Sequence, residues 1–203
     1  KYCWLVIKIC IVQNFYRTGN PPVGHCIPNI KKPFQGTVTY DGQDCASSEV
    51  RKKIGYLPER PYFYQFLTAN ELLKYFGKLS GMSDVLLKKR IPEVLTEVGM
   101  LHALNLELKK FSKGMLQRIG IAQAILHEPE FLILDEPTSA LDRTVQKQIV
   151  ELLRHLQAEY GFACLFISHD LGVIEHLCDR VVVMYLGRVV ESAPVEELFA
   201  RPQ

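Results

Sequence analysis

The sequence predicts an α/β fold with a parallel sheet core and a helical subdomain at about 65–127. Two observations predict the sheet. FLIL (131–134) and ACLFI (163–167) are unbroken apolar runs, and a helix-length segment separates them, as in parallel strands covered on both faces. The subdomain is predicted by apolar residues at helical spacing. At 203 residues, 48% of them hydrophobic, the chain can form one full-sized domain with a sizeable core.

The first sixty residues predict strands and a loop. CWLVIKICIV (3–12) favours a buried strand, because Lys8 interrupts it and it is too short to span a bilayer. Residues 17–36 hold three Gly and four Pro and are predicted to be a loop. TVTY followed by Asp41-Gly42 indicates a hairpin, and IGYL (54–57) indicates a short strand.

Helix signals dominate residues 68–127. Thr68 and Glu71 are spaced as a capping box, and Ser83 could cap the next helix. Pro92 would split that helix or open a second one. Ser112 is a plausible N-cap for a helix that runs to about residue 127.

The C-terminal third alternates between helix and strand. Helices are expected at 142–159 and 170–177, and RVVVMY (180–185) is expected to be a strand. The tail RVVE (188–191) would pair with it across Leu186-Gly187. Because ligands of such sheets gather beyond the carboxyl ends of the strands, residues just after 134 and 167 are the candidates for chemistry.

The charge and the cysteine content limit the classes of partner and the redox environment that the sequence supports. The net charge of +2, from scattered basic residues, gives no support for a nucleic-acid partner. The six cysteines show no metal-ligand or C-x-x-C spacing, which favours reduced thiols in a cytosolic protein.

Asp135 and Glu136 directly follow the FLIL run. A carboxylate at the end of a buried strand can hold Mg²⁺, and its neighbour can position or deprotonate water. The alternative is an ordinary turn or helix-capping pair. His169 follows the next strand and could stabilise a phosphoryl group or the attacking water, or be merely a packed or solvated residue. Ser112-Lys113-Gly114 opens a helix, which is either an anion site or a simple cap.

Taken in order, FSKGMLQRIGIAQAIL, HEPEFLILDEPTSALD and FISHD resemble the ATP-binding cassette (ABC) ATPase family. The resemblance covers roughly residues 30–203. It implies a P-loop-NTPase-like fold, with an ABC ATPase-like domain at 31–203 and an atypical segment at 1–30.

Individual motifs imply residue roles. FSKGM resembles the family signature, with Lys113 where Gly is usual, and SALD (139–142) resembles the D-loop. IGYLPERPYFYQFLT resembles the Q-loop region, with Glu59 where Gln is usual. FLILDE resembles Walker B, and SHD (168–170) resembles the segment of the switch histidine.

The resemblance implies ATP and Mg²⁺ as cofactors. Asp135 and Glu59 would hold Mg²⁺, Glu136 would be the general base, and His169 would sense the γ-phosphate. The four residues that would also contact nucleotide are Ser112, Lys113, Gly114 and Asp142. Ser112 and Gly114 would reach the ATP bound to a second ABC ATPase subunit. A transmembrane permease would be the other partner, docked on the Q-loop and the helices at 68–99, at the cytoplasmic face of the membrane.

One family motif, Walker A (G-x-x-x-x-G-K-[ST]), is absent from the sequence. We therefore expect impaired ATP binding and a core that lacks its central strand, as in a truncated copy of a transporter ATPase. The alternatives are a pseudo-cassette that completes a partner's ATP site and a soluble ABC-type ATPase. FSKGMLQRIGIAQAI is similar to exporter cassettes and HDLGVIEHLCDRVVVMYLGRVVESAPVEELFARPQ to oligopeptide-uptake cassettes, so the direction of transport stays open.

Overall fold

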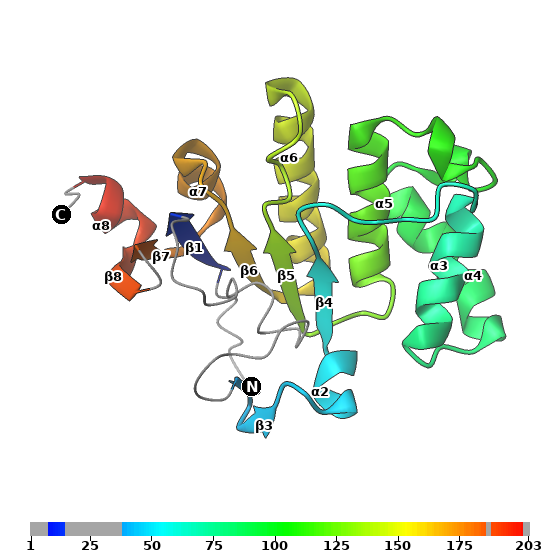
Figure 1. Ribbon diagram of the computed structural model, residues 1–203, viewed down its shortest axis with the longest axis horizontal. Coiled ribbons are helices and arrows are strands. Elements are labelled where there is room, and N and C mark those ends of the chain that lie inside the picture. The colour runs from blue at the N-terminus through cyan, green and yellow to red at the C-terminus, as the bar shows by residue number, and fades with distance from the viewer. Residues whose placement is uncertain (1–7, 15–37, 186–187, 201–203) are drawn as a thin grey trace.

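The computed structural model of the chain describes residues 8–14, 38–185 and 188–200. A six-stranded sheet runs through it in the order β4-β5-β6-β1-β7-β8 (Figure 1). The strands from β4 to β7 are parallel, and β8 is antiparallel to β7. In sheet order they are β4 (Ile54–Leu57), β5 (Phe131–Asp135), β6 (Ala163–Ile167), β1 (Lys8–Asn14), β7 (Arg180–Tyr185) and β8 (Arg188–Pro194). The predicted parallel sheet and the predicted C-terminal hairpin are confirmed.

The centre of the sheet is formed by β1. Ile9 pairs with Leu165 of β6 on one side and with Arg180 of β7 on the other. The expectation that the core lacks its central strand is therefore wrong, because the apolar segment near the start of the sequence supplies it. The predicted loop at 17–36 lies outside the described residues, as does most of the segment 1–30.

The two faces of the sheet bury different residues, because neighbouring side chains of a strand point to opposite sides. Leu132 and Leu134 of β5 belong to the main core, together with Leu153 of α6 (Arg143–Tyr160). Ile133 belongs to a second cluster with Val50 of α2 (Ser48–Lys52). The sequence analysis did not find α2, which is only five residues long and begins at the N-cap Ser47.

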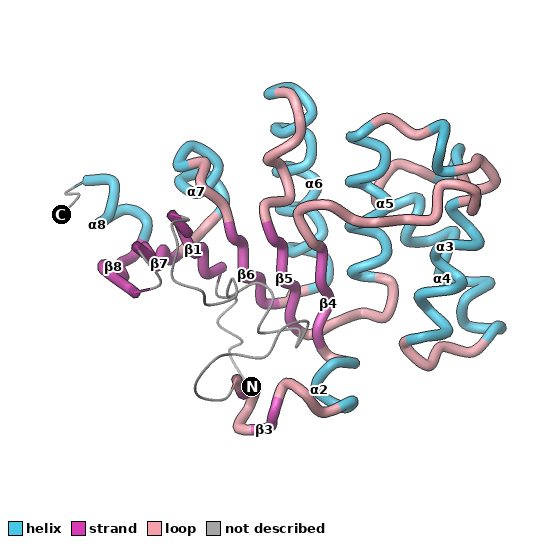
Figure 2. Tube along the Cα trace, in the orientation of Figure 1, coloured by secondary structure: helices cyan, strands magenta, loops and turns pink. Residues whose placement is uncertain are grey.

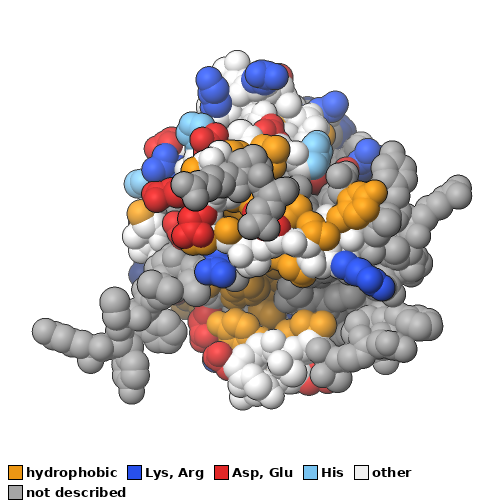
Figure 3. All heavy atoms as spheres, turned by 90° about the vertical axis from the view of Figure 1, so that its left-hand side faces the viewer, with side chains coloured by type: hydrophobic (Ala, Val, Ile, Leu, Met, Phe, Trp, Pro, Cys, Tyr) orange, Lys and Arg blue, Asp and Glu red, His pale blue; other side chains and the backbone are white. Residues whose placement is uncertain are grey.

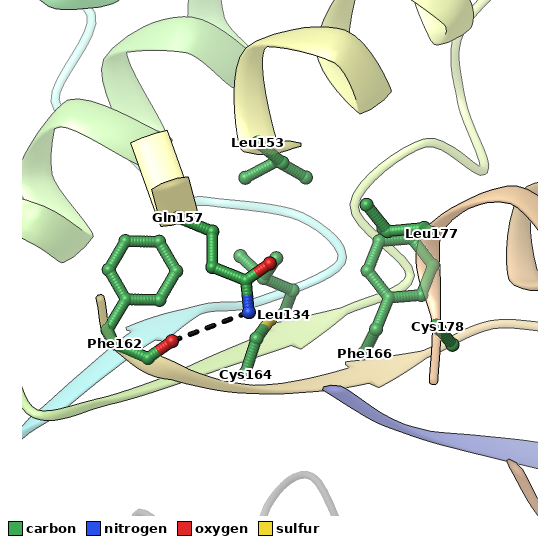
Figure 4. Close-up of a pocket in the computed structure, with 8 residues that line it drawn as sticks. All are labelled: Leu134, Leu153, Gln157, Phe162, Cys164, Phe166, Leu177 and Cys178. Atoms are coloured by element: carbon green, nitrogen blue, oxygen red, sulfur yellow. Dashed lines mark hydrogen bonds between the residues drawn. The ribbon is translucent and has the colours of Figure 1, made fainter. Parts of the chain in front are cut away.

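A small cavity of about 10 Å³ lies under α6 (Figure 4). Gln157 of α6 is its one amide, and its Nε2 donates to the carbonyl oxygen of Phe162 at 3.5 Å. The hydrogen bond satisfies a polar group within an apolar core. The cavity is lined by Leu134, Leu153, Gln157, Phe162, Cys164, Phe166, Leu177 and Cys178.

Three helices stand beside the sheet at the β4 edge (Figure 2). They are α3 (Ala69–Leu79), α4 (Asp84–Glu97) and α5 (Lys113–Ile125), with short 3-10 turns at Leu101–Ala103 and Leu108–Lys110. The capping box of Thr68 and Glu71 is confirmed, and so are the N-caps Ser83 and Ser112. The subdomain boundaries at 65 and 127 stay a prediction.

Pro92 lies inside the single helix α4. The expectation that it would split this helix or open a second one is therefore wrong. Proline lacks a backbone N–H and disfavours a helix interior by about 3 kcal/mol or more. Here packing outweighs that penalty, since Ile91, Val94 and Leu95 on either side of Pro92 are fully or almost fully buried.

Arg90 of α4 joins the helical part to the core. Its side chain is only 6% exposed, and Nη1 donates to Glu97 at 2.9 Å while Nη2 donates to the hydroxyl of Tyr160 at 2.8 Å. Tyr160 ends α6, so this arginine connects two helices on opposite sides of the β4 edge. Its Nε also lies 3.5 Å from Oε1 of Glu128.

The hairpin predicted at TVTY is confirmed as β2 (Thr39–Tyr40) and β3 (Gln43–Asp44). Its turn residues Asp41 and Gly42 have φ of 49° and 73°, the positive values that a two-residue hairpin turn requires. Among the described cysteines, Cys45 and Cys178 are buried free thiols, and the reduced state of the six cysteines stays a prediction.

The far end of the sheet carries α7 (Leu171–Leu177) and α8 (Val195–Ala200). Figure 3 shows this face, on which acidic and basic side chains are interspersed with hydrophobic ones. Within the described ranges, no helix is both long and apolar enough to cross a membrane.

Candidate active site

Asp135 is the last residue of β5 and is 91% buried, with 9% exposure. The hydroxyl of Tyr56, on the neighbouring strand β4, donates to its Oδ2 at 3.5 Å. Burial of the phenol, the charge of Asp135 and this hydrogen bond raise the pKa of Tyr56, so that the hydroxyl keeps its proton. The sequence analysis missed Tyr56. Its position near the end of a strand beside β5 was the available signal.

Glu136 adopts a left-handed backbone conformation with φ of 49°, which is uncommon for a residue with a side chain. Its N–H donates to the carbonyl of Ile167 on β6 at 2.9 Å, and its own carbonyl accepts from Ser139 Oγ at 3.1 Å. These bonds hold the strained turn. Strain of this kind, about 1–3 kcal/mol, occurs most often where geometry serves function.

The side chains of Glu136 and His169 meet at this edge. Nδ1 of His169 lies 2.8 Å from Oε1 of Glu136. The glutamate side chain is only 13% exposed, whereas that of the histidine is 68% exposed. The sequence predicted that the residues after β5 and β6 lie at the same edge of the sheet, and the structure confirms this.

Burial and neighbouring charges set the protonation of the pair. Burial raises the pKa of Glu136, and the negative charges of Asp135 and Glu59 raise it further, while His169 opposes both effects. The hydrogen bond to Glu136 and the charge of that carboxylate raise the pKa of His169. The histidine therefore holds a proton toward the glutamate over a wider pH range than a free imidazole would.

The second carboxylate oxygen of Glu136, Oε2, is buried and has no hydrogen-bond partner among the described residues. An unsatisfied buried oxygen of this kind requires an explanation. With Oε1 held by His169, Oε2 is the atom that could accept a proton from a water molecule.

Glu59 follows β4 and forms an exposed ion pair with Arg60, in which Nε lies 3.6 Å from Oε1. Such surface pairs contribute little to stability, so Arg60 does not fix Glu59 in place. The residue is close enough for its charge to raise the pKa of both Glu136 and His169. Asp135 and Glu59, the other two sequence-predicted carboxylates, thus both lie within electrostatic reach of Glu136.

The residues fit a Mg²⁺ ion that substrate phosphates help to bind. In the described ranges, no group of three or more His, Cys, Asp or Glu side chains could hold a metal alone. Mg²⁺ needs no such cage, because it commonly takes one or two carboxylates and completes its shell with phosphates and water. The acidic charge that raises the pKa of Glu136 is the charge that a cation would neutralise.

Ser112, Lys113 and Gly114 lie apart from this edge, at the start of α5. Ser112 Oγ accepts the N–H of Met115 at 3.2 Å and acts as a helix cap. A Cβ on Gly114 would lie 2.9 Å from Cγ1 of Val145, so a side chain at this position would require Val145 of α6 to shift. In the described part of the chain, no hydrogen bond or ion pair joins Ser112, Lys113 or Gly114 to Glu136 or His169.

Asp142 caps α6 by accepting the N–H groups of Thr144 and Val145, both at 3.0 Å. The capping role that the sequence analysis held as an alternative for the acidic pair therefore applies to Asp142 and not to Glu136. Asp170 caps α7 in the same way.

A family model described as ABC transporter matches residues 24–139, more than half of the chain. The chain belongs to the ABC transporter family. A solved structure described as the ATP binding subunit of an ABC transporter has a TM-score of 0.79 and 27% identity to it, over 95% of this chain and 81% of that one. The P-loop-NTPase-like fold that the resemblance implied is thereby confirmed.

Two relatives are named for peptide transport. A protein of Brucella ovis, named as a peptide import ATP-binding protein, is 38% identical over 196 residues, which are 92% of this chain and 62% of that protein. The oligopeptide transport ATP-binding protein OppF of Lactococcus lactis is 35% identical over 199 residues, 92% of this chain and 61% of OppF. The chain thus spans about three fifths of the length of these curated relatives.

Proposed function

We propose that this ABC-family chain binds Mg²⁺ and ATP at the carboxyl edge of β4, β5 and β6, hydrolyses the nucleotide, and couples this to the uptake of peptides. The contact of His169 with Glu136 carries the proposal. It leaves one buried glutamate oxygen without a partner, which suits a general base. The names of the two relatives support peptides as the transported class.

We propose a different role for each carboxylate, according to its position. Asp135 and Glu59 are the proposed Mg²⁺ ligands, and Glu136 is the proposed base. His169 holds Glu136 and is the proposed sensor of the terminal phosphate. The metal, when bound, neutralises phosphate charge during transfer. Asp142, at the start of α6, is a proposed nucleotide contact.

A second ABC ATPase subunit is the proposed partner for the start of α5. Among the described residues, no hydrogen bond or ion pair links Ser112, Lys113 or Gly114 to Glu136, which suits a role toward another subunit. The helix N-terminus and the exposed Lys113 favour an anionic ligand. We propose that this ligand is the nucleotide held by the other subunit.

A permease is the proposed partner for the groove between β4 and α3. The groove has a volume of about 330 Å³ and aromatic walls. Tyr62 of its lining is 92% exposed, and Phe66, four residues further along the chain, is 71% exposed, a concentration of apolar surface that marks an interaction site. A cytoplasmic segment of the permease would cover it and hold the chain at the membrane face. The lining includes Tyr56, Tyr62, Phe63, Phe76, Gln123 and His127.

Weak phosphate binding is common to the proposal and to its alternative, the pseudo-cassette. The sequence has no Walker A motif, and each charge-assisted hydrogen bond lost would weaken ATP binding by about 1.5–3 kcal/mol. We therefore propose weak ATP affinity for this chain. A pseudo-cassette that only completes a partner's site would also lack the motif. Such a protein would not need the Glu136–His169 geometry, which favours hydrolysis.

The test is ATP turnover at high Mg²⁺-ATP concentration in the wild type, Glu136→Gln and Glu151→Gln. Glu151 is an exposed residue of α6 outside the site and serves as the control. Glu136→Gln is expected to lower turnover by about 100-fold or more and to leave nucleotide affinity nearly unchanged. Equal turnover in wild type and Glu136→Gln would remove Glu136 from the role of base. A wild type without turnover at any concentration would favour the pseudo-cassette.

A further inference from the structure

Gln146 of α6 forms a hydrogen bond to the loop that carries His169. Its Nε2 donates to Oδ2 of Asp170 at 2.8 Å. Asp170 is the residue directly after His169, so this bond links the helix after β5 to the loop after β6. The hydrogen bond also lowers the pKa of Asp170, which keeps the carboxylate ionised and able to accept.

Asp170 is fixed on its other side as well. Its Oδ1 accepts the N–H of Gly172 at 3.0 Å and that of Val173 at 3.3 Å. Its own N–H donates to Ser168 Oγ at 3.1 Å, and Ser168 is only 1% exposed. The backbone on both sides of His169 is thus held, and Gln146 supplies the one side-chain bond from outside this loop to Asp170 among the described residues.

The support for Gln146 is rigid. Its N–H donates to the carbonyl of Asp142 at 2.8 Å in the first turn of α6. One turn later Ile149 is fully buried, and Leu153 and Leu156 follow on the same core-facing side. A side chain at this position therefore moves with the core and not with the loop.

The imidazole of His169 depends on its backbone for orientation. It is 68% exposed, and within the described ranges its one hydrogen bond runs to Oε1 of Glu136. An exposed ring with a single partner is oriented mainly by the position of its Cα. A shift of this loop would break the bond and leave Oε1 of a largely buried glutamate unpaired, which is costly.

We propose that Gln146 is a positioning residue, which holds Asp170 so that His169 keeps its Nδ1 on Glu136. The two hydrogen bonds, from Gln146 to Asp170 and between His169 and Glu136, are observed in the structure, and the backbone joins Asp170 to His169. Its consequence for ATP hydrolysis rests on the proposed function.

The test compares Gln146→Met with Gln148→Met by nitrogen NMR of the histidine side chains. Methionine keeps the length of the side chain and removes the donor. Gln148 lies on the same helix, and its Oε1 only accepts from Arg118 at 3.5 Å, so it is a matched control. In the wild type and in the control, neutral His169 is expected to carry its proton on Nδ1, because a carboxylate accepts there. In Gln146→Met the proton is expected to move to Nε2 in a substantial fraction of molecules, with an unchanged far-UV spectrum.

An unchanged tautomer in a folded Gln146→Met variant would overturn the proposal. If that variant does not fold, the wild type still decides: the side-chain amide hydrogens of Gln146 should exchange with solvent several-fold more slowly than those of Gln148. Equal exchange would also overturn it.

ATP turnover forms a separate readout. With Gln146→Met we expect a fall in kcat of about tenfold to a hundredfold with KM within twofold, since misplacement of a catalytic group by about 1 Å costs that much. Unchanged kcat in the presence of an altered tautomer would overturn the positioning role in catalysis. Absence of turnover in the wild type would count against the proposed function alone, because the tautomer measurement does not require it.

Discussion

The Nδ1 atom of His169 lies 2.8 Å from Oε1 of Glu136, although 33 positions separate the two residues in the chain. The contact exists because β5 and β6 are parallel neighbours, in which Asp135 pairs with Ile167. Both strands therefore end at the same level, and the residues that follow them meet. The pair combines a buried carboxylate with an exposed imidazole, which makes its protonation and its stability testable.

The pair should make stability depend on pH. The pKa of His169 is raised in the folded state from 6.5, so the folded protein binds more protons than the unfolded chain above about pH 6.5. By linkage, the stabilisation is fully present below that pH and is lost as pH rises through the raised pKa. Because the imidazole is mostly exposed, we expect an effect below about 1 kcal/mol.

Urea unfolding of the wild type and His169→Gln at pH 6 and pH 8.5 measures this effect. The stability difference between the two proteins should be larger at pH 6. A difference that is equal at both pH values, or larger at pH 8.5, would show that the folded state does not raise this pKa.

The central position of β1 predicts strong sensitivity to proline. Ile11 pairs with Ile167 of β6 and with Val182 of β7, so its strand is hydrogen-bonded on both sides. Ile11→Pro removes a backbone donor there and leaves its carbonyl partner unsatisfied, which should lower the free energy of unfolding by about 1–3 kcal/mol. Chemical denaturation would measure the loss.

Val190 provides the control for Ile11. It lies at the irregularity between β7 and β8 and has no partner in their register, so Val190→Pro should cost much less. If Ile11→Pro is as stable as the wild type, the placement of β1 in the middle of the sheet is contradicted.

Arg90 should contribute more to the stability of the fold than an exposed charged residue does. Arg90→Met removes the partner of the Glu97 carboxylate and of the Tyr160 hydroxyl, both held at less than 3 Å. Breaking a buried ion pair on one side costs about 3–5 kcal/mol. We expect thermal and urea unfolding to show a loss near the lower end, because Glu97 is 16% exposed.

Lys89→Met is the matched control on the same helix. Lys89 is 79% exposed and lies 3.9 Å from Glu93, so its loss should cost below about 1 kcal/mol. If both variants lose the same stability, Arg90 does not join the helical part to the core.

Local sequence signals predicted most elements, because their causes are local. Thr68 and Glu71 cap a helix through bonds to their own neighbours, and the short apolar run before Asp135 has the length and the composition of a buried strand. The placement of β1 could not be predicted, since it depends on pairing with residues more than 150 positions away. Pro92 predicts a helix break that does not occur, because tertiary packing keeps α4 continuous.

The residues of the candidate site also fall into those that local motifs predict and those that depend on distant contacts. The motif order found Asp135, Glu136 and His169 without a structure. Tyr56 and Gln146 were missed because each acts through a hydrogen bond to a distant residue and neither belongs to a local pattern. The role of Asp142 as the cap of α6 was available from its position before a helix, but the family resemblance directed attention to the nucleotide.

The most direct test of the account is an NMR titration of the chain with ATP, with and without Mg²⁺, in the wild type, Asp135→Asn and Glu151→Gln. We predict that Mg²⁺-ATP shifts the signals of residues 135–139 and 168–170 before all others, even if affinity is weak. Asp135→Asn should remove the Mg²⁺ dependence and Glu151→Gln should keep it. Signals at this edge that stay in place at saturating nucleotide, or that shift equally without Mg²⁺, would contradict the assignment of this edge as the Mg²⁺-nucleotide site.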